Sequence, residues 1–292
     1  MKRYPVYSVQ NFSYKLDDSQ LYVNSLENHL KLHGFVHKAH RHNSYLMVYF
    51  TGGFGEHIID FEKYDIKPNS LFMLQPGQMH YWTLSEDIKG YIILFSKEIY
   101  QLYFGQKKAS DFQFYRSTSS DPHLYLNSWE QTSLLFYYDL LLKESQNRMM
   151  FKIEMMTNIL DCIHIEIARK YKEVYPSIKA QYNTKIASFE ILVEEDFRYQ
   201  KRPAFYAMKL NISLKHLNRL STEILQKRAT DVILDRVVLE IKRMLVDQNL
   251  SINEIADKMG FEDYSYFSRF FKKNVQLSPT AFRAAAIERS LG

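Results

Sequence analysis

The clearest pattern of hydrophobic and polar positions lies in residues 251–273, where it predicts two short helices. Ser251 followed by Glu254 forms a capping box, which is typical of a helix start. Apolar residues then recur at the helical spacing i, i+3, i+4 and i+7, at Ile252, Ile255, Ala256 and Met259. Gly260 ends this helix, because glycine readily adopts the left-handed conformation of a helix C-terminus. A second helix is predicted to begin near Asp263.

The predicted second helix has one apolar stripe and one polar stripe. The apolar stripe holds Phe267, Phe270 and Phe271, and the polar stripe holds Ser265, Ser268, Arg269 and Lys272. Two helices joined by a tight turn form a helix-turn-helix, whose second helix lies in the DNA major groove. Arginine and lysine bind phosphates or guanine edges, and serine can donate or accept a hydrogen bond. The spacing alone also fits a helical hairpin with a solvated face.

A second segment, residues 203–228, has the same layout. Pro203 suits the first position of a short helix, Asn211 suits a turn with positive φ, and Ser213 suits the cap of the next helix. Its expected inner residues are Tyr206, Ala207, Leu210, Leu217, Leu220 and Ile224, and its expected outer residues are Lys215, His216, Arg219 and Thr222. The two segments form an internal repeat of 49 to 50 residues, since Ala207 aligns with Ala256 and Arg219 with Arg269. A long helix over 231–247 is predicted to join them through Leu234, Val237, Val238, Ile241 and Leu245.

Residues 1 to about 110 show a different pattern, which favours β-structure. Aromatic and β-branched runs at 44–51, 56–61, 70–74 and 90–95 are separated by turn formers such as Gly52-Gly53 and Pro76-Gly77. This spacing predicts a small barrel or jelly roll.

Residues 128–173 return to helical spacing. The second helix of this stretch has an apolar stripe at Ile153, Met156, Thr157, Leu160, His164 and Ile167, and a back stripe at Phe151, Met155, Ile159 and Cys162. A helix that is apolar on two sides has two neighbours. We expect one to be its own barrel and the other to be the same helix of a second subunit; burial under the C-terminal domain is the alternative. Residues 174–184 contain Pro176 and polar residues, and are the predicted linker between domains 1–173 and 185–292.

Composition and charge narrow the class of protein. A hydrophobic content of 46% and an aromatic content of 15% indicate a globular chain. The single cysteine, Cys162, excludes an internal disulfide framework and fits a reducing compartment. With neither a signal peptide nor a membrane-length apolar run in the sequence, we expect a soluble cytoplasmic protein. Residues 184–292 hold 18 lysines and arginines against 14 acidic residues, a net charge of +4 that suits contact with phosphates.

The C-terminal residues closely resemble the second helix-turn-helix of AraC-type transcription regulators. The positions that carry the resemblance are Ile255, Ala256, Gly260, Phe261, Ser265, Tyr266, Phe267, Arg269, Phe271, Lys272, Pro279, Phe282 and Arg283. Gln276 departs from the pattern, because the family usually has glycine there. The resemblance implies a double-headed DNA-binding domain of seven helices. Its expected DNA-contacting residues are Lys215, His216 and Arg219 in the first head, and Tyr264, Ser265, Ser268, Arg269 and Lys272 in the second.

The N-terminal residues resemble the cupin-type ligand-binding domain of the same family. The stretch from His40 and the turn Pro76-Gly77-x-x-His80 carry this resemblance. It implies a ligand site formed by His40, His42, His80 and Trp82. The histidines also match parts of the metal motifs of cupin enzymes, but residues 43–47 lack the glutamate that should follow His42. We therefore expect no metal and no other cofactor, and histidines that either hydrogen-bond an organic ligand or are satisfied inside the barrel.

The sequence thus predicts an α+β protein, with a cupin-like barrel and dimerisation helices followed by an all-α domain that carries two helix-turn-helix motifs. The expected function is transcription regulation rather than catalysis. The expected partners are promoter DNA, a small-molecule effector such as a sugar, a second copy of the chain and RNA polymerase, with no membrane. Two alternatives remain at this point. One is a metal-dependent cupin enzyme fused to a DNA-binding domain, and the other is an architectural DNA binder without an effector.

Overall fold

A computed structural model describes residues 5–12, 20–33, 39–115, 120–175, 184–246 and 250–289. The chain divides into two compact units, one ending at Tyr175 and the other beginning at Pro176. Most of the predicted linker, residues 176–183, lies outside the described ranges. No helix in the described ranges is long and apolar enough to cross a membrane.

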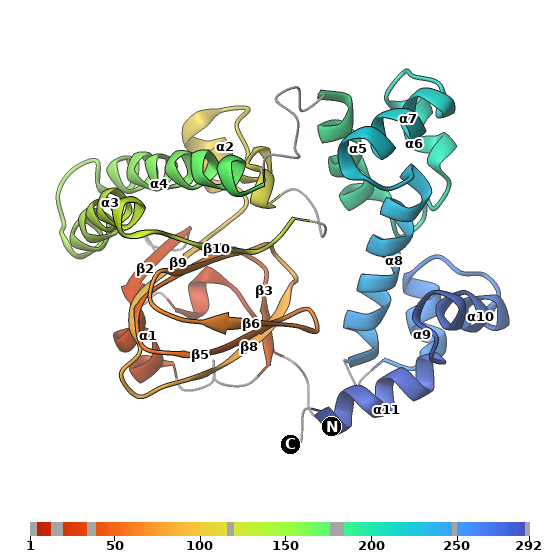
Figure 1. Ribbon diagram of the computed structural model, residues 1–292, viewed down its shortest axis with the longest axis horizontal. Coiled ribbons are helices and arrows are strands. Elements are labelled where there is room, and N and C mark those ends of the chain that lie inside the picture. The colour runs from red at the N-terminus through yellow and green to blue at the C-terminus, as the bar shows by residue number, and fades with distance from the viewer. Residues whose placement is uncertain are drawn as a thin grey trace. The chain divides into compact units, whose positions relative to one another are not determined.

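The N-terminal unit combines β-strands with helices, and its two longest helices come last in the chain (Figure 1). Its strands are β1 (Val6–Tyr7), β2 (Leu21–Ser25), β3 (His40–His42), β4 (Tyr45–Gly52), β5 (Gly55–Ile59), β6 (Glu62–Ile66), β7 (Ser70–Leu74), β8 (Met79–Leu84), β9 (Lys89–Phe95) and β10 (His123–Tyr125). Its helices are η1 (Val9–Asn11), α1 (Leu26–Leu32), α2 (Ile99–Phe104), η4 (Ala109–Asp111), η5 (Gln113–Tyr115), α3 (Ser128–Gln146) and α4 (Lys152–Val174).

The described strands form two five-stranded sheets. The first has the order β1-β3-β8-β5-β6, and the second has the order β10-β7-β4-β9-β2. Inward side chains of both sheets share one hydrophobic core, with Val48, Phe72 and Leu94 from the second sheet and Ile59 and Trp82 from the first. The two sheets therefore enclose a common interior, as the sequence predicted, and we call them the barrel.

The predicted strand 56–61 ends two residues early. β5 stops at Ile59, because Asp60 and Phe61 adopt positive φ angles of 46° and 80°. Two such residues make the tight turn that leads a hairpin into its next strand, here β6. The sequence pattern alone did not show that these residues leave the strand.

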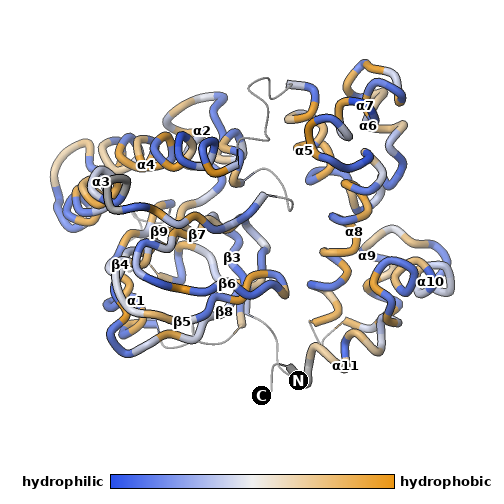
Figure 2. The backbone as a smooth tube through the Cα atoms, in the orientation of Figure 1, coloured by the Kyte–Doolittle hydropathy of each residue, from blue (hydrophilic) through white to orange (hydrophobic). Residues whose placement is uncertain are grey.

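Helices α3 and α4 cover the outer face of the second sheet. The rings of Tyr49 and Tyr91 lie 5.3 Å from the Tyr138 ring of α3, and the Phe95 ring lies 5.2 Å from His164 of α4. The tube in Figure 2 alternates between hydrophobic and hydrophilic residues along α4, as expected of a helix with one buried face.

The back stripe of α4 differs from the prediction at one position. Ile159 is only 5% exposed, so its assignment to a second, open face was wrong. The open face of α4 instead consists of Phe151, Met155, Asn158, Cys162 and Ile165, which we call the outer stripe. Ile159 belongs to the buried face of α4.

The C-terminal unit is helical throughout its described part. Its helices are α5 (Thr184–Asp196), α6 (Pro203–Lys209), α7 (Leu214–Leu225), α8 (Ala229–Val246), α9 (Ile252–Lys258), α10 (Tyr264–Val275) and α11 (Pro279–Arg289). In Figure 1, α8 runs between α6–α7 at one end and α9–α10 at the other. The sequence predicted this linking helix, and the structure begins it two residues earlier, at Ala229.

The core face of α8 is rotated from the predicted one. Ile233, Val237, Ile241 and Leu245 are fully buried, whereas Leu234 and Val238 are only partly buried. The adjoining face buries three charged residues, Arg236, Glu240 and Arg243. A pattern of apolar residues does not reveal a helix face that is buried through ion pairs.

Candidate functional site

The second helix-turn-helix is built as the sequence predicted. The Ser251 side chain accepts from the Glu254 amide at 3.1 Å, and the Glu254 carboxylate accepts from the Ser251 amide at 2.7 Å. The turn at Gly260 has a φ of +66°. A Cβ at this residue would lie 2.9 Å from the Arg198 carbonyl oxygen, so glycine is required there for space as well as for conformation.

Helix α10 buries its aromatic face and exposes the predicted DNA-contacting face. Phe267 and Phe271 are fully buried, while Ser265, Arg269 and Lys272 are exposed. Ser268 is partly buried, and the exposed Tyr264 donates from its hydroxyl to Asp257 at 3.0 Å. Within the described residues, Arg269 has neither a hydrogen bond nor an ion pair, so its guanidinium is available to another molecule.

The first helix-turn-helix has the same design with different residues. The Ser213 hydroxyl caps α7 by accepting from the His216 amide at 3.1 Å, and Asn211 forms the turn with a φ of 53°. Lys215, His216 and Arg219 are exposed on α7. Arg219 lies 2.9 Å from Glu223 of the same helix, in contrast to the open Arg269.

The backbone repeats between the two heads as well. Gln226 follows α7 with a φ of 56°, and Gln276 follows α10 with a φ of 64°. Each glutamine therefore adopts the left-handed conformation that glycine adopts most readily. The departure at Gln276 changes the side chain but leaves the turn in the conformation that glycine would take.

Charged residues that the sequence did not single out join α5 to α8, the helix between the two heads. Arg236 donates to Glu194 at 2.7 Å and to Glu240 at 3.0 Å. Burial alone would raise the pKa of Glu240, but Arg236 and Arg243 lower it to about 2. This carboxylate therefore stays charged and paired at neutral pH.

Lys201 fixes the end of the helix that precedes the second recognition helix. Its ammonium donates to the Arg198 carbonyl at 2.6 Å and to the Met259 carbonyl at 2.5 Å, and lies 4.5 Å from the centre of the Phe261 ring. Burial lowers the pKa of Lys201 to about 8. This role could not be predicted from the sequence, because Met259 lies 58 positions from Lys201 in the chain.

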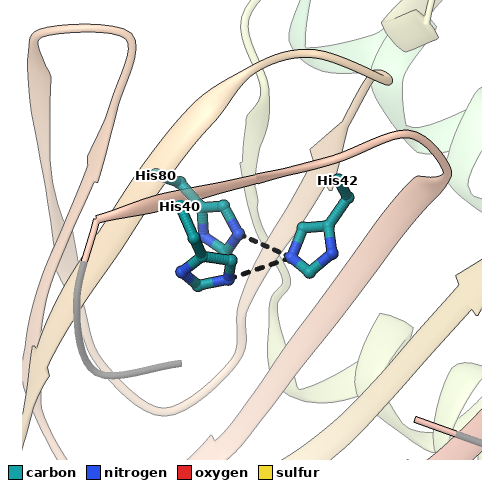
Figure 3. Close-up of side chains that lie close together, drawn as sticks. All are labelled: His40, His42 and His80. Atoms are coloured by element: carbon teal, nitrogen blue, oxygen red, sulfur yellow. Dashed lines mark hydrogen bonds between the residues drawn. The ribbon is translucent and has the colours of Figure 1, made fainter. Parts of the chain in front are cut away.

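Three of the four predicted ligand residues of the N-terminal unit meet inside the barrel. His40 and His42 share one face of β3, and His80 of β8 lies opposite His40 in the strand register. The His42 Nε2 atom is 3.0 Å from His40 Nε2 and 3.0 Å from His80 Nε2 (Figure 3). Burial first, and neighbouring histidines second, hold the pKa values of His42 and His80 well below the usual range. These rings are therefore neutral at neutral pH.

The fourth predicted residue, Trp82, lies beside this cluster. Its ring is 5.4 Å from the His80 ring and 5.3 Å from His57, a buried histidine of β5 that the sequence analysis did not select. His57 Nε2 lies 3.0 Å from His80 Nδ1. The inward alternation along β5, opposite Trp82 in the register, is the signal that could have identified it.

Several polar atoms of this interior have no protein partner. Among the described residues, Trp82 Nε1, Ser44 Oγ, His42 Nδ1 and His57 Nδ1 are buried without a hydrogen bond. Buried polar groups normally have a partner, so each such atom requires an explanation. The N-terminal residues Tyr7 and Phe12 cover the cluster, with ring centres 5.5 Å from His40 and 5.7 Å from His42, respectively.

Comparison with known proteins agrees with both halves of this description. Residues 26–147 match the family model of the AraC-like ligand binding domain, and residues 206–285 match a helix-turn-helix domain. The chain therefore belongs to the AraC-type transcription regulators, with a ligand-binding domain and a DNA-binding domain.

Individual relatives are distant. An uncharacterized HTH-type transcriptional regulator, YfiF of Bacillus subtilis, is 22% identical over 253 residues, which cover 84% of this chain and 78% of that protein. A structure of ToxT from Vibrio cholerae is 14% identical with a TM-score of 0.44, covering 90% of this chain and 98% of that chain. The C-terminal domain of the response regulator yesN from Fusobacterium nucleatum is 26% identical with a TM-score of 0.33. The match covers 35% of this chain and 99% of that chain.

Proposed function

We propose that α7 and α10 enter successive major grooves of promoter DNA. Lys215, His216 and Arg219 would contact DNA from the first head, and Tyr264, Ser265, Ser268, Arg269 and Lys272 from the second. The supporting observation is that each helix buries its apolar face and leaves these side chains at least partly exposed. Hydrogen bonds to base edges would supply sequence specificity, and contacts with phosphates would supply much of the affinity.

The two heads contribute unequally in this proposal. Arg269 has no competing partner among the described residues, whereas Arg219 must give up its contact with Glu223 before it can bind a base. An exposed ion pair of this type on a helix contributes only about 0.3–0.5 kcal/mol, so the rearrangement is inexpensive. We expect α10 to supply more of the specificity and α7 to supply an accessory contact.

The proposed effector site lies inside the barrel, with His40, His42, His80 and Trp82 as its binding residues. The buried polar atoms without partners support this placement, because a bound molecule would provide the missing hydrogen bonds. Regulation then requires the effector to bind the DNA-competent arrangement more tightly than the other arrangement. The expected assembly is a cytoplasmic homodimer, joined through the outer stripe of α4, that contacts RNA polymerase at the promoter.

We propose regulation rather than catalysis for the barrel. The alternative was a metal-dependent cupin enzyme, whose first metal motif places a glutamate a few residues after His42. The cluster of ligating groups found among the described residues contains only histidines, and Asn43 to Met47 fill the positions where the glutamate would stand. Residues 43–47 therefore contain no carboxylate that could take the place of the motif's glutamate.

A metabolite screen tests the proposed effector role. Full-length protein is screened for compounds that raise its melting temperature, since a ligand bound only to the folded state stabilises it. A true effector is expected to change the affinity for promoter DNA as well, and Trp82→Phe should weaken its binding. Compounds that bind at Trp82 but leave DNA affinity unchanged would contradict effector-dependent regulation.

A further inference from the structure

The three barrel histidines converge on one point through equivalent ring atoms. One nitrogen from each of His40, His42 and His80 lies within 4.8 Å of the corresponding nitrogens of the other two. All three residues are buried, with exposed fractions of 4% or less. Figure 3 shows the rings of His40 and His80 side by side, with His42 facing both.

Hydrogen bonds among the three rings cannot account for both short contacts of His42. A ring nitrogen either donates its single hydrogen or accepts through its single lone pair. His42 Nε2 has two ring nitrogens at 3.0 Å, so it cannot form a full hydrogen bond with both. A metal ion removes the conflict, because it accepts one lone pair from each of the three rings at the same time.

The separations also agree with coordination of one ion. Two imidazole nitrogens that are each about 2.1 Å from a zinc ion lie about 3.0–3.4 Å from each other, for angles between about 90° and 109°. The two observed separations of 3.0 Å are within this range. The ligand nitrogens of the third pair, His40 and His80, are within 4.8 Å of each other.

A further histidine orients one of these rings. His57 Nε2 lies 3.0 Å from His80 Nδ1, on the side of the ring away from the cluster. A hydrogen on His80 Nδ1 that is donated to His57 leaves Nε2 with its lone pair directed to the cluster. Second partners of this kind are typical of metal-binding histidines, where they fix the tautomer and the ring orientation.

We propose that His40, His42 and His80 bind one divalent transition-metal ion of the zinc type. Three imidazoles suit zinc, cobalt or nickel, whereas magnesium and calcium prefer oxygen donors, and none is present in this cluster. The inference rests on the proposed effector site and deepens it, since three residues of that site would hold an ion in addition to the organic effector. Three protein ligands leave a fourth position open, as in other three-histidine zinc sites.

Metal titration of the full-length protein, with no affinity tag and after chelator treatment, tests the site. Cobalt(II) serves as the spectroscopic probe and zinc as the competitor. We expect one ion per chain with the visible absorption of a four-coordinate cobalt site, and about a hundredfold weaker binding in His42→Gln and His80→Gln. The matched control is His164→Gln, which alters a fully buried histidine of the same unit outside the cluster and should bind normally.

A measurement on the unaltered protein covers the case in which a variant fails to fold. X-ray absorption of the zinc-loaded protein should show imidazole nitrogens at about 2.0–2.1 Å. A spectrum with sulfur ligation would place the ion at the exposed Cys162 and overturn the proposal, as would unchanged binding in folded His42→Gln or no binding by the unaltered protein. Because these measurements contain no DNA, their failure would leave the proposed promoter binding intact.

Discussion

Arg219 and Arg269 occupy equivalent positions in the two recognition helices but have different surroundings. Arg219 is paired with Glu223, whereas Arg269 is exposed and has no ion pair among the described residues. An exposed side chain without partners contributes little to the stability of the fold, so its replacement should act on DNA binding alone.

We predict that Arg269→Ala weakens binding to a selected promoter site by about 1–3 kcal/mol, the range for losing one base contact. Fluorescence anisotropy over several salt concentrations measures this loss, and the melting temperature should not change. The control is Lys97→Ala, which removes an exposed charge from the ligand-binding unit. An equal loss on unrelated DNA, with a shallower salt dependence, would show that Arg269 contacts only phosphate.

His164 predicts how the stability of the N-terminal unit depends on pH. Its ring is fully buried and stacks 4.9 Å from Phe112. Burial, and then the nearby Lys107, lower the pKa of His164 to about 3. An unfolded histidine binds a proton below pH of about 6.5, whereas the folded one stays neutral. The contribution of His164 to the free energy of unfolding should therefore be complete above pH of about 6.5. It should decrease as pH falls from there towards 3.

The measurement compares urea unfolding of the unaltered protein and His164→Gln between pH 7 and pH 5. Both tryptophans, Trp82 and Trp129, lie in the N-terminal unit, so their fluorescence reports that unit alone. Below pH of about 6.5 the unaltered protein should lose up to about 1.4 kcal/mol per pH unit more than the variant. Identical pH dependences would mean that His164 takes up its proton in the folded state too.

At the scale of single elements, the turn of the second helix-turn-helix has the strictest local requirement. Gly260 combines a φ of +66° with a space that a Cβ would overfill. We predict that Gly260→Ala destabilises the C-terminal unit by about 1–3 kcal/mol, through the left-handed backbone and the close Arg198 carbonyl. Circular dichroism should show an earlier loss of helix, while the tryptophan transition stays unchanged.

The control for this turn is Gln276→Gly. Gln276 has nearly the same φ, 64°, but already carries a side chain. The substitution removes the strain of a positive φ and adds freedom to the unfolded chain, so the two effects should nearly cancel. A destabilisation as large as that of Gly260→Ala would mean that the clash with Arg198 is not the main cause.

Elements with strong local signals were predictable from the sequence, and those defined by distant contacts were not. The caps at Ser213 and Ser251, and the turns at Asn211 and Gly260, depend on neighbouring residues and were found at the expected positions. The ion pair between Arg236 and Glu194 joins residues 42 positions apart, and Ile159 belongs to the buried face of α4. The cluster of His40, His42 and His80 was predicted as a set, but its geometry and the contact with His57 required the strand register.

The outer stripe of α4 predicts the subunit contact. Met155 is 52% exposed and Ile165 is 37% exposed, so the outer stripe presents apolar side chains to solvent. We predict that Met155→Glu combined with Ile165→Glu yields monomers by light scattering, because the charges would be buried at an apolar contact. Tryptophan fluorescence should show that the barrel remains folded.

The control for the subunit contact is Leu102→Glu, an equivalent change at an exposed residue of α2. It should leave the assembly unchanged. If the doubly substituted protein stays dimeric at micromolar concentration, the subunits meet through another surface and this assignment of the outer stripe is wrong.

At the scale of the whole molecule, α8 sets the separation between the two DNA-binding heads. Its 18 residues span about 27 Å at about 1.5 Å per residue. With the bodies of the two heads at its ends, the recognition helices can lie about 34 Å apart, which is one turn of B-DNA. Binding by the second head is then intramolecular, so affinity rises without additional chemistry.

The central claim is that one chain reads DNA with both heads. Selection of random DNA by the full-length protein, followed by sequencing, tests it most directly. We predict enriched sites with two short, different sub-sites about one helical turn apart, and a large loss of affinity when five base pairs are inserted between them. A single enriched sub-site, or affinity that survives the insertion unchanged, would contradict the claim and leave only one head in contact with bases.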